Sequence, residues 1–178
     1  HQTGLWIMVG LLLVGLSVSA FASGTLVIGV NQAPTHFDPA LTVAHAGTVI
    51  QYNICGYLVR TDAKLNLYPA IAQSWEADET VTQWTFHIRP GVKFHNGREL
   101  VAQDVKYSFE RTMSEKLASR YRGDFANVDS IEVLDKYTVV VRLKKPDADF
   151  PRVISDSNSS AGAIVPQEEA EKPGFDTH

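Results

Sequence analysis

The stretch that decides the fold comprises residues 84–109, WTFHIRPGVKFHNGRELVAQDVKYSF. Apolar and polar side chains alternate over residues 83–89, a pattern that predicts a strand with one buried face. That face would carry Trp84, Phe86 and Ile88. The turn dipeptides Pro90-Gly91 and Asn96-Gly97 follow, and they predict two reversals of the chain because glycine tolerates the backbone angles that tight turns require.

Residues 102–113 give the strongest helix prediction in the chain. Apolar side chains recur there at spacings of three and four, namely at Ala102, Val105, Phe109 and Met113, so they would line one face of a helix. Asp104 lies in the first turn, where a carboxylate is favoured by the helix dipole. Val101 precedes the helix and, unlike serine or threonine, has no side-chain oxygen to cap it.

The flanking sequence predicts further short elements from strand-like runs, helical spacing and proline positions. Strands are expected over residues 25–31 and 57–62, and in a hairpin that turns at Asp135-Lys136. Short helices are expected over residues 47–58, from Ala70 with Ile71 and Trp75 buried, over residues 149–155, and after a strand within residues 164–174.

The composition fits a globular protein of one domain or slightly more. The chain has 178 residues and a formal net charge of −4, and it lacks the basic tract that a nucleic-acid partner would require. Cys55 is the single cysteine, so no intramolecular disulfide and no cysteine-rich zinc site is possible.

The N-terminal sequence resembles an export signal. Residues 5–22 form an uncharged apolar run that ends in Ala20-Phe21-Ala22, the small-x-small pattern of a signal peptidase site, so the mature chain would begin at Ser23. No cysteine lies near that position, which favours a periplasmic protein over a lipoprotein. The alternative is a membrane-tethered interaction module that keeps this segment as an uncleaved anchor, since 18 apolar residues can just span a bilayer. We also expect residues to be missing at both ends.

His87 and His95 are the candidates for a metal site within the deciding stretch. They flank the Pro90-Gly91 turn, and the chain has no His-Glu-x-x-His pair, no Gly-x-Ser-x-Gly elbow and no phosphate-binding glycine loop. We therefore expect no enzyme and no cofactor. A secreted metal-dependent hydrolase that uses His36, His45, His87 or His95 remains the alternative from another class.

Four aromatic residues could form either a ligand-stacking platform or part of the core. They are Trp75, Trp84, Phe86 and Phe94. Because they fall at alternating strand positions, core packing is the better explanation.

Three linked blocks carry a resemblance to a known family. They are LYPAIAQSWE at residues 67–76, WTFHIRPGVKFHNGREL at residues 84–100 and AQDVKYSFER at residues 102–111. In this order and spacing they resemble the N-terminal part of the ABC-transporter substrate-binding proteins of the oligopeptide, dipeptide and nickel group. The family commonly has threonine where this chain has Val101.

The resemblance implies an α/β fold of the periplasmic-binding-protein type II. The chain would hold a signal peptide (1–22), the first segment of lobe one (23–60), and the inserted α+β subdomain with the start of the return to lobe one (61–178). It implies a monomeric periplasmic protein that captures a small solute, most often a di- or oligopeptide, between two lobes. The solute is then delivered to the permease subunits of the importer.

The resemblance also implies where the ligand lies. In relatives, the loop after the first strand and the segment leading into the first helix reach the ligand from lobe one. Carried over by position, these residues are His36, Phe37, Thr42, Ala44, His45 and Gly47; an ordinary surface loop is the alternative. Much of the recognition comes from the second lobe, so we expect this chain alone to bind weakly or not at all.

Overall fold

The computed structural model describes most of the chain beyond its N-terminal region. The described residues are 27, 29, 36–42, 45–156 and 160–175. The apolar run at 5–22 and most of the predicted strand at 25–31 lie outside them. Among the described residues, no helix is long and apolar enough to cross a membrane.

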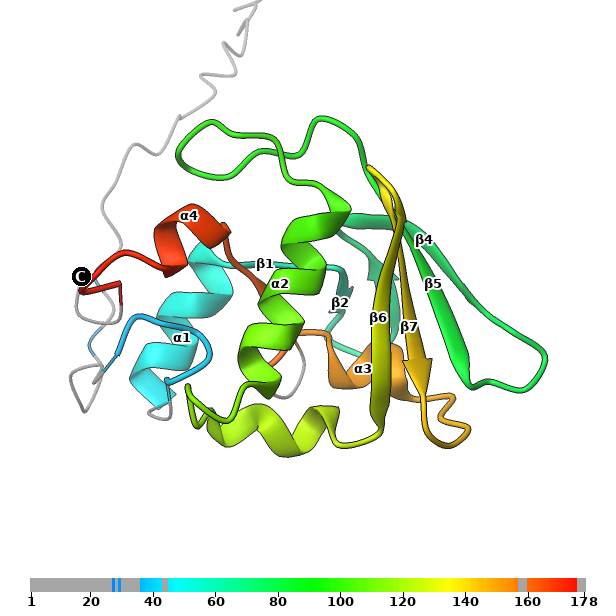
Figure 1. The fold of residues 1–178 in the computed structure, drawn as a ribbon. Helices are drawn as coiled ribbons and strands as arrows, with labels where there is room; N and C mark the ends of the chain where they lie inside the picture. Colours follow the sequence, from blue (N-terminus) through cyan, green and yellow to red (C-terminus); the bar gives the residue numbers. More distant parts are fainter. Residues whose placement is uncertain (1–26, 28, 30–35, 43–44, 157–159, 176–178) are drawn as a thin grey trace, which may run out of the picture.

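A four-stranded antiparallel sheet organises the fold (Figure 1). Its strand order is β4 (Ala72–Ala77), β5 (Gln83–Ile88), β7 (Thr138–Leu143) and β6 (Val128–Asp135). The predicted strand over 83–89 is confirmed as β5. The predicted hairpin is confirmed as β6 and β7, which pair from Asp135 opposite Thr138 outward.

The alternation in β5 buries the side chains that the sequence indicates. Trp84, Phe86 and Ile88 are buried, and Phe86 is fully so. The ring of Phe86 lies 6.5 Å between centroids from Trp84 and from Phe150. Trp75 and Phe94 pack against this core as partly buried side chains. The core interpretation of the four aromatic residues is therefore confirmed.

The predicted helix over 102–113 is confirmed as α2 (Ala102–Met113), which packs on one face of the sheet against β6 and β7. In Figure 1 it stands between the sheet and two helices on its other side, α1 (His45–Ile54) and α4 (Gln167–Ala170). Val105 and Phe109 are fully buried, and the Phe109 ring lies 5.2 Å from that of Phe125 at the end of the 3₁₀ helix η1 (Arg120–Phe125).

The predicted helix starting at Ala70 is wrong. The segment forms β3 (Leu67–Pro69) and then the edge strand β4, in which Trp75 pairs with Phe86. Hydrogen bonds to β5 outweigh the local signal of Pro69, because β structure depends on cross-strand partners that local sequence does not reveal. An irregularity between Ala72 and Ser74 also breaks the alternation that marks a regular strand.

Segments from both ends of the described chain meet beside α2. The helix α1 (His45–Ile54) leads into β1 (Gly56–Tyr57), which pairs with β8 (Ala163–Ile164) shortly before α4 (Gln167–Ala170). The helix predicted over 47–58 is thus confirmed, although it begins and ends earlier.

The remaining elements are short. The strand predicted over 57–62 is divided between β1 and β2 (Val59–Thr61), and β2 pairs with β3. The turn predicted over 149–155 is confirmed as α3 (Phe150–Val153), and the strand and helix predicted within 164–174 correspond to β8 and α4.

Candidate functional site

The loop over residues 36–42 contains several of the residues predicted to meet the ligand, and Asp38 is its centre. The side chain of Asp38 is 1% exposed. Its Oδ1 accepts hydrogen bonds from the backbone N–H of Ala40 (3.0 Å) and from Nη1 of Arg111 (2.9 Å), and its Oδ2 accepts from Nη2 of Arg111 (2.5 Å). The carboxylate therefore shapes the loop and fastens it to α2.

Thr42 closes the other end of this loop. Its hydroxyl lies 2.8 Å from the carbonyl oxygen of His36 and 3.0 Å from that of Asp38, and it accepts a hydrogen bond from the side-chain amide of Gln51 (2.5 Å). Gln51 in turn accepts a hydrogen bond from the hydroxyl of Ser160. Thr42 is fully buried, so the structure gives its side chain a role in shaping the loop.

The 3₁₀ helix η1 and its cap supply two more anchors. The hydroxyl of Ser119 donates to the carbonyl of Ala40 (2.6 Å), and the hydroxyl of Tyr121 donates to the carbonyl of Thr42 (2.6 Å). The loop is thus held by α1, α2 and η1, which leaves its backbone little freedom.

The other predicted site residues differ in exposure, and some of them lie outside the described residues. His36 is half-buried, whereas Phe37 is 37% exposed. Gly47 lies in α1 so close to Thr42 that an added Cβ would overlap the Thr42 methyl group. His45 begins α1, but its side chain and all of Ala44 lie outside the described residues.

A hydrophobic cavity of about 960 Å³ borders the loop. Phe37 and Pro39 line it from the loop. The other walls come from the end of α1, from the turn residues 92–96 and from the residues around α4. Those walls include Ile54, Cys55, Val92, Phe94, Val165 and Phe175. Burial raises the pKa of the Cys55 thiol to about 12, so this wall presents an uncharged sulfur at neutral pH. The cavity can accept apolar groups.

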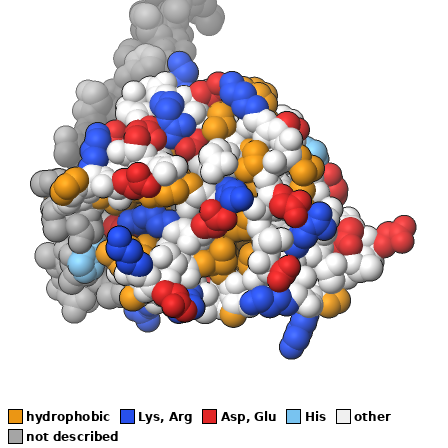
Figure 2. Space-filling view, viewed as in Figure 1, with side chains coloured by type: hydrophobic (Ala, Val, Ile, Leu, Met, Phe, Trp, Pro, Cys, Tyr) orange, Lys and Arg blue, Asp and Glu red, His pale blue; other side chains and the backbone are white. Residues whose placement is uncertain are grey.

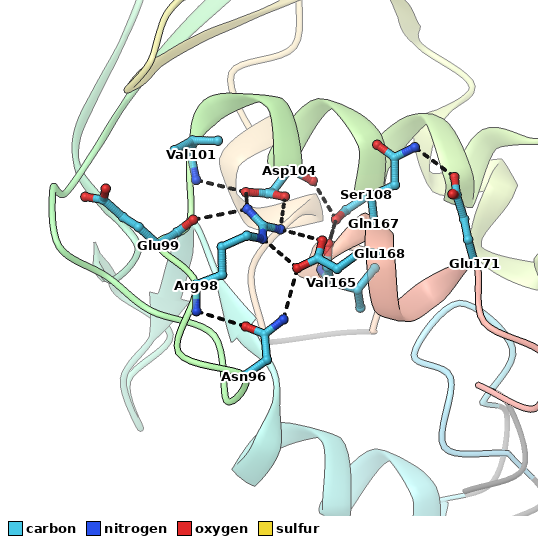
Figure 3. A network of polar contacts seen from close by, with 10 residues as sticks. All are labelled: Asn96, Arg98, Glu99, Val101, Asp104, Ser108, Val165, Gln167, Glu168 and Glu171. Atoms are coloured by element: carbon cyan, nitrogen blue, oxygen red, sulfur yellow. Dashed lines mark hydrogen bonds and ion pairs between the residues drawn. The ribbon is translucent and has the colours of Figure 1, made fainter.

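A polar network ties the scaffold together at the N-terminal end of α2 (Figure 3). Arg98 donates two hydrogen bonds to Asp104 (3.0 and 2.6 Å) and two to Glu168 in α4 (2.5 and 2.9 Å). Asn96 adds a bond to Glu168 (2.9 Å), and Asp104 accepts from the N–H of Val101 (2.9 Å). Asp104 thereby caps the helix that Val101 cannot cap with its side chain.

This network predicts an acid-dependent loss of stability. The Arg98 guanidinium lowers the pKa of Glu168 from its ordinary 4.5 to about 2. A carboxyl with a depressed folded-state pKa stabilises the fold above its unfolded pKa, and that contribution disappears as pH falls toward the folded value. Glu168→Gln should therefore melt below wild type at pH 7, and the two melting temperatures should converge between pH 4.5 and 2.

The control for this prediction is Glu79→Gln. Glu79 is an exposed carboxylate in the turn between β4 and β5, so its variant should follow wild type at every pH in thermal melts recorded by circular dichroism. A difference between Glu168→Gln and wild type that stayed constant from pH 7 to pH 2 would contradict the assignment.

The structure separates the two histidines of the deciding stretch. His87 Nε2 lies 2.9 Å from Glu76 Oε1 across β4 and β5, and His95 is exposed in the turn beside the cavity. Within the part of the chain that the structure describes, no three His, Cys, Asp or Glu side chains gather as metal ligands would.

The surface carries both signs of charge. Lys and Arg side chains alternate with Asp and Glu over the face shown in Figure 2, with hydrophobic side chains between them. A face with both signs of charge does not produce the single-sign field that steers highly charged ligands.

Comparison with known proteins assigns the family. The profile described as "Bacterial extracellular solute-binding proteins, family 5 Middle" matches residues 66–178. The chain belongs to this family. The resemblance carried by the three sequence blocks is thereby confirmed, and the matched range contains the whole four-stranded sheet and α2.

Individual relatives agree with this family. The chain is 32% identical to "Di/tripeptide-binding protein 1" of Pseudomonas aeruginosa, over 80% of this chain and 30% of the relative. It is 31% identical to "Oligopeptide-binding protein AppA" of Bacillus subtilis, over 81% of this chain and 26% of the relative. The chain thus spans less than a third of the length of either protein.

Solved structures confirm the predicted type II periplasmic-binding-protein fold for the part that this chain covers. The structure of AppA from Bacillus subtilis in complex with a nonapeptide superposes with a TM-score of 0.71 at 26% identity, over 81% of this chain and 29% of that one.

Proposed function

We propose that this chain is the N-terminal part of a periplasmic solute-binding protein that captures peptides for an ABC importer. The observation that carries the proposal is the family match over residues 66–178. Peptides are proposed as the ligand because relatives are named as di/tripeptide-binding and oligopeptide-binding proteins.

The loop over residues 36–42 would be the part of lobe one that meets the peptide, together with the start of α1. His36, Phe37, Ala44 and His45 remain the proposed contact residues, and the predicted site residues Thr42 and Gly47, which are buried, would contribute by shaping the loop. The loop is anchored through Asp38, Ala40 and Thr42, and a surface that is ordered before binding avoids much of the entropy loss on association.

Capture would be non-covalent. In the proposed mechanism a second lobe closes over the peptide about a hinge, and the permease recognises the closed form. Buried apolar surface and a few polar groups would provide affinity, and the protein would carry out no chemistry on the peptide.

The division of the chain follows the same proposal. Residues 1–22 would be a signal peptide that directs export to the periplasm, residues 23–60 the first segment of lobe one, and residues 61–178 the inserted subdomain with the start of the return. The mature protein would act as a monomer without a cofactor, and its partners would be the peptide and the permease subunits.

Calorimetry tests this function. The product of the complete reading frame should bind trialanine or a nonapeptide with a Kd of about 1 µM or lower. Residues 23–178 alone should give no measurable heat, because most of the enclosing surface would be missing. Micromolar binding by residues 23–178 would contradict the two-lobe mechanism, and failure of the complete product to bind any peptide would contradict the ligand class.

A further inference from the structure

The buried ion pair between α2 and the loop joins residues 73 positions apart in the sequence. Arg111 lies in the last turn of α2, and its side chain is 13% exposed, against 1% for Asp38. Both terminal nitrogens of the guanidinium bind the carboxylate, one to each oxygen. This bidentate geometry fixes the orientation of the carboxylate as well as its position.

The orientation of Asp38 determines the shape of the loop. Its Oδ1 accepts from the N–H of Ala40, and its carbonyl oxygen accepts from the N–H of Leu41 (3.1 Å) and of Thr42 (3.0 Å). The amide of Ala40 therefore depends on the carboxylate that Arg111 orients, and the amides of Leu41 and Thr42 depend on the backbone carbonyl of the same residue.

The other anchors do not duplicate this contact. Ser119 and Tyr121 hold the carbonyls of Ala40 and Thr42, which form the second half of the loop. The first half is adjacent to Asp38, and Thr42 and Gln51 bind the carbonyls of His36 and Phe37 there. These contacts hold carbonyl groups, whereas Arg111 holds the Asp38 carboxylate.

Arg111 also reaches the wall of the cavity. Its guanidinium carbon lies 5.5 Å from the centroid of the Phe175 ring, within the range of a cation–π contact. Phe175 and Phe37 both line the cavity. One guanidinium thus contacts both Asp38 in the loop and Phe175, a lining residue of the cavity.

We infer that Arg111 is a positioning residue for peptide binding, which acts through Asp38 by holding the loop over residues 36–42 in its binding shape. The inference rests on the proposed function. Without Arg111, the buried carboxylate would lose its charged partner, and the loop would open to let water reach it. The peptide would then have to order the loop again on binding.

Hydrogen exchange tests the structural half of the inference on the 178-residue chain. In Arg111→Met, the amides of Ala40, Leu41 and Thr42 should exchange at least about tenfold faster than in wild type. Arg98→Met is the matched control, because it removes the partner of a buried aspartate at the other end of the same helix. It should accelerate the amide of Val101, which binds Asp104, and leave the loop amides unchanged.

Peptide affinity tests the functional half in the product of the complete reading frame. The Kd for trialanine should rise about tenfold or more in Arg111→Met, as expected when a preorganised site must be ordered by its ligand. It should stay at the wild-type value in Arg98→Met. Arg111→Lys keeps the charge and loses the bidentate geometry, so its Kd should fall between those of wild type and Arg111→Met.

The outcomes are distinguishable. If the wild-type product binds no peptide, the proposed function fails, and the exchange of Ala40 still decides whether Arg111 orders the loop. If Arg111→Met exchanges at Ala40 like wild type, or binds trialanine like wild type despite faster exchange, the inference is overturned. Should Arg111→Met lose protection throughout β5 and β7, the same two comparisons are made with Arg111→Lys.

Discussion

Phe86→Ala is expected to lower the free energy of unfolding by about 3 to 5 kcal/mol, the usual range for removing a buried aromatic side chain. Phe86 is fully buried in the central strand β5, where it pairs with Trp75 on one side and Val139 on the other. Its ring also contacts those of Trp84 and Phe150. The truncation therefore leaves a cavity in the core on the buried face of the sheet, beside Trp84 and Phe150.

Urea denaturation followed by tryptophan fluorescence measures this loss, since Trp84 lies beside the altered position. Tyr68→Ala is the control, because Tyr68 is 41% exposed on β3 and surface truncations usually change stability by less than about 0.5 kcal/mol. A loss below about 1 kcal/mol for Phe86→Ala would show that the site collapses without cost, contrary to the packing described.

Gly162→Ala is expected to destabilise the chain by about 3 kcal/mol or more, at the upper end of the cost of overpacking. Gly162 is buried just before β8, and an added Cβ would overlap the carbonyl group of Ile154. The obstructing atoms are backbone, so no side-chain rotation relieves the overlap. Either β8 or the end of α3 must move.

Thermal melts of Gly162→Ala and Gly123→Ala separate this overlap from the general effect of replacing glycine. Gly123 lies in η1 with no atom within 4 Å of an added Cβ, so its variant should melt within a few degrees of wild type. Equal melting temperatures for the two variants would rule out the close approach at Gly162.

The parts of the fold that were predictable from the sequence are those with a strong local pattern. The strand β5 and the helix α2 each carry an uninterrupted period of apolar residues, and the hairpin has two strand-like runs on either side of Asp135-Lys136. The strand β4 does not, because its irregularity near Ala72 hides the alternation and its stability comes from pairing with β5. A local proline signal was therefore a poor guide to that segment.

Burial on the second face of the sheet was also beyond the local pattern. Val140 falls on the face opposite Val139 and Val141, yet it is 2% exposed. In the sheet it is flanked by Thr85 on β5 and Glu132 on β6. Which residues flank Val140 is decided by the register in which β5, β7 and β6 pair, and the local sequence does not reveal that register.

The anchors of the candidate site were missed for a similar reason. Asp38 has the pattern of a turn residue before proline, and Arg111 that of a basic residue near the end of a helix. Each pattern explains its residue without a distant partner, and the sequence spacing gives no sign that Asp38 and Arg111 form an ion pair. Only the packing of α2 beside the loop brings them together.

The pairing of β1 with β8 has a consequence for how such chains diversify. Gly56 lies opposite Ile164 and Tyr57 opposite Ala163, so the polypeptide departs and re-enters at one point. Recombination could replace the whole segment between these strands, residues 58–162, and the chain on either side would still meet at the same two positions. An exchanged segment would need to preserve Arg111, Ser119 and Tyr121, because these three side chains bind the loop over residues 36–42 directly.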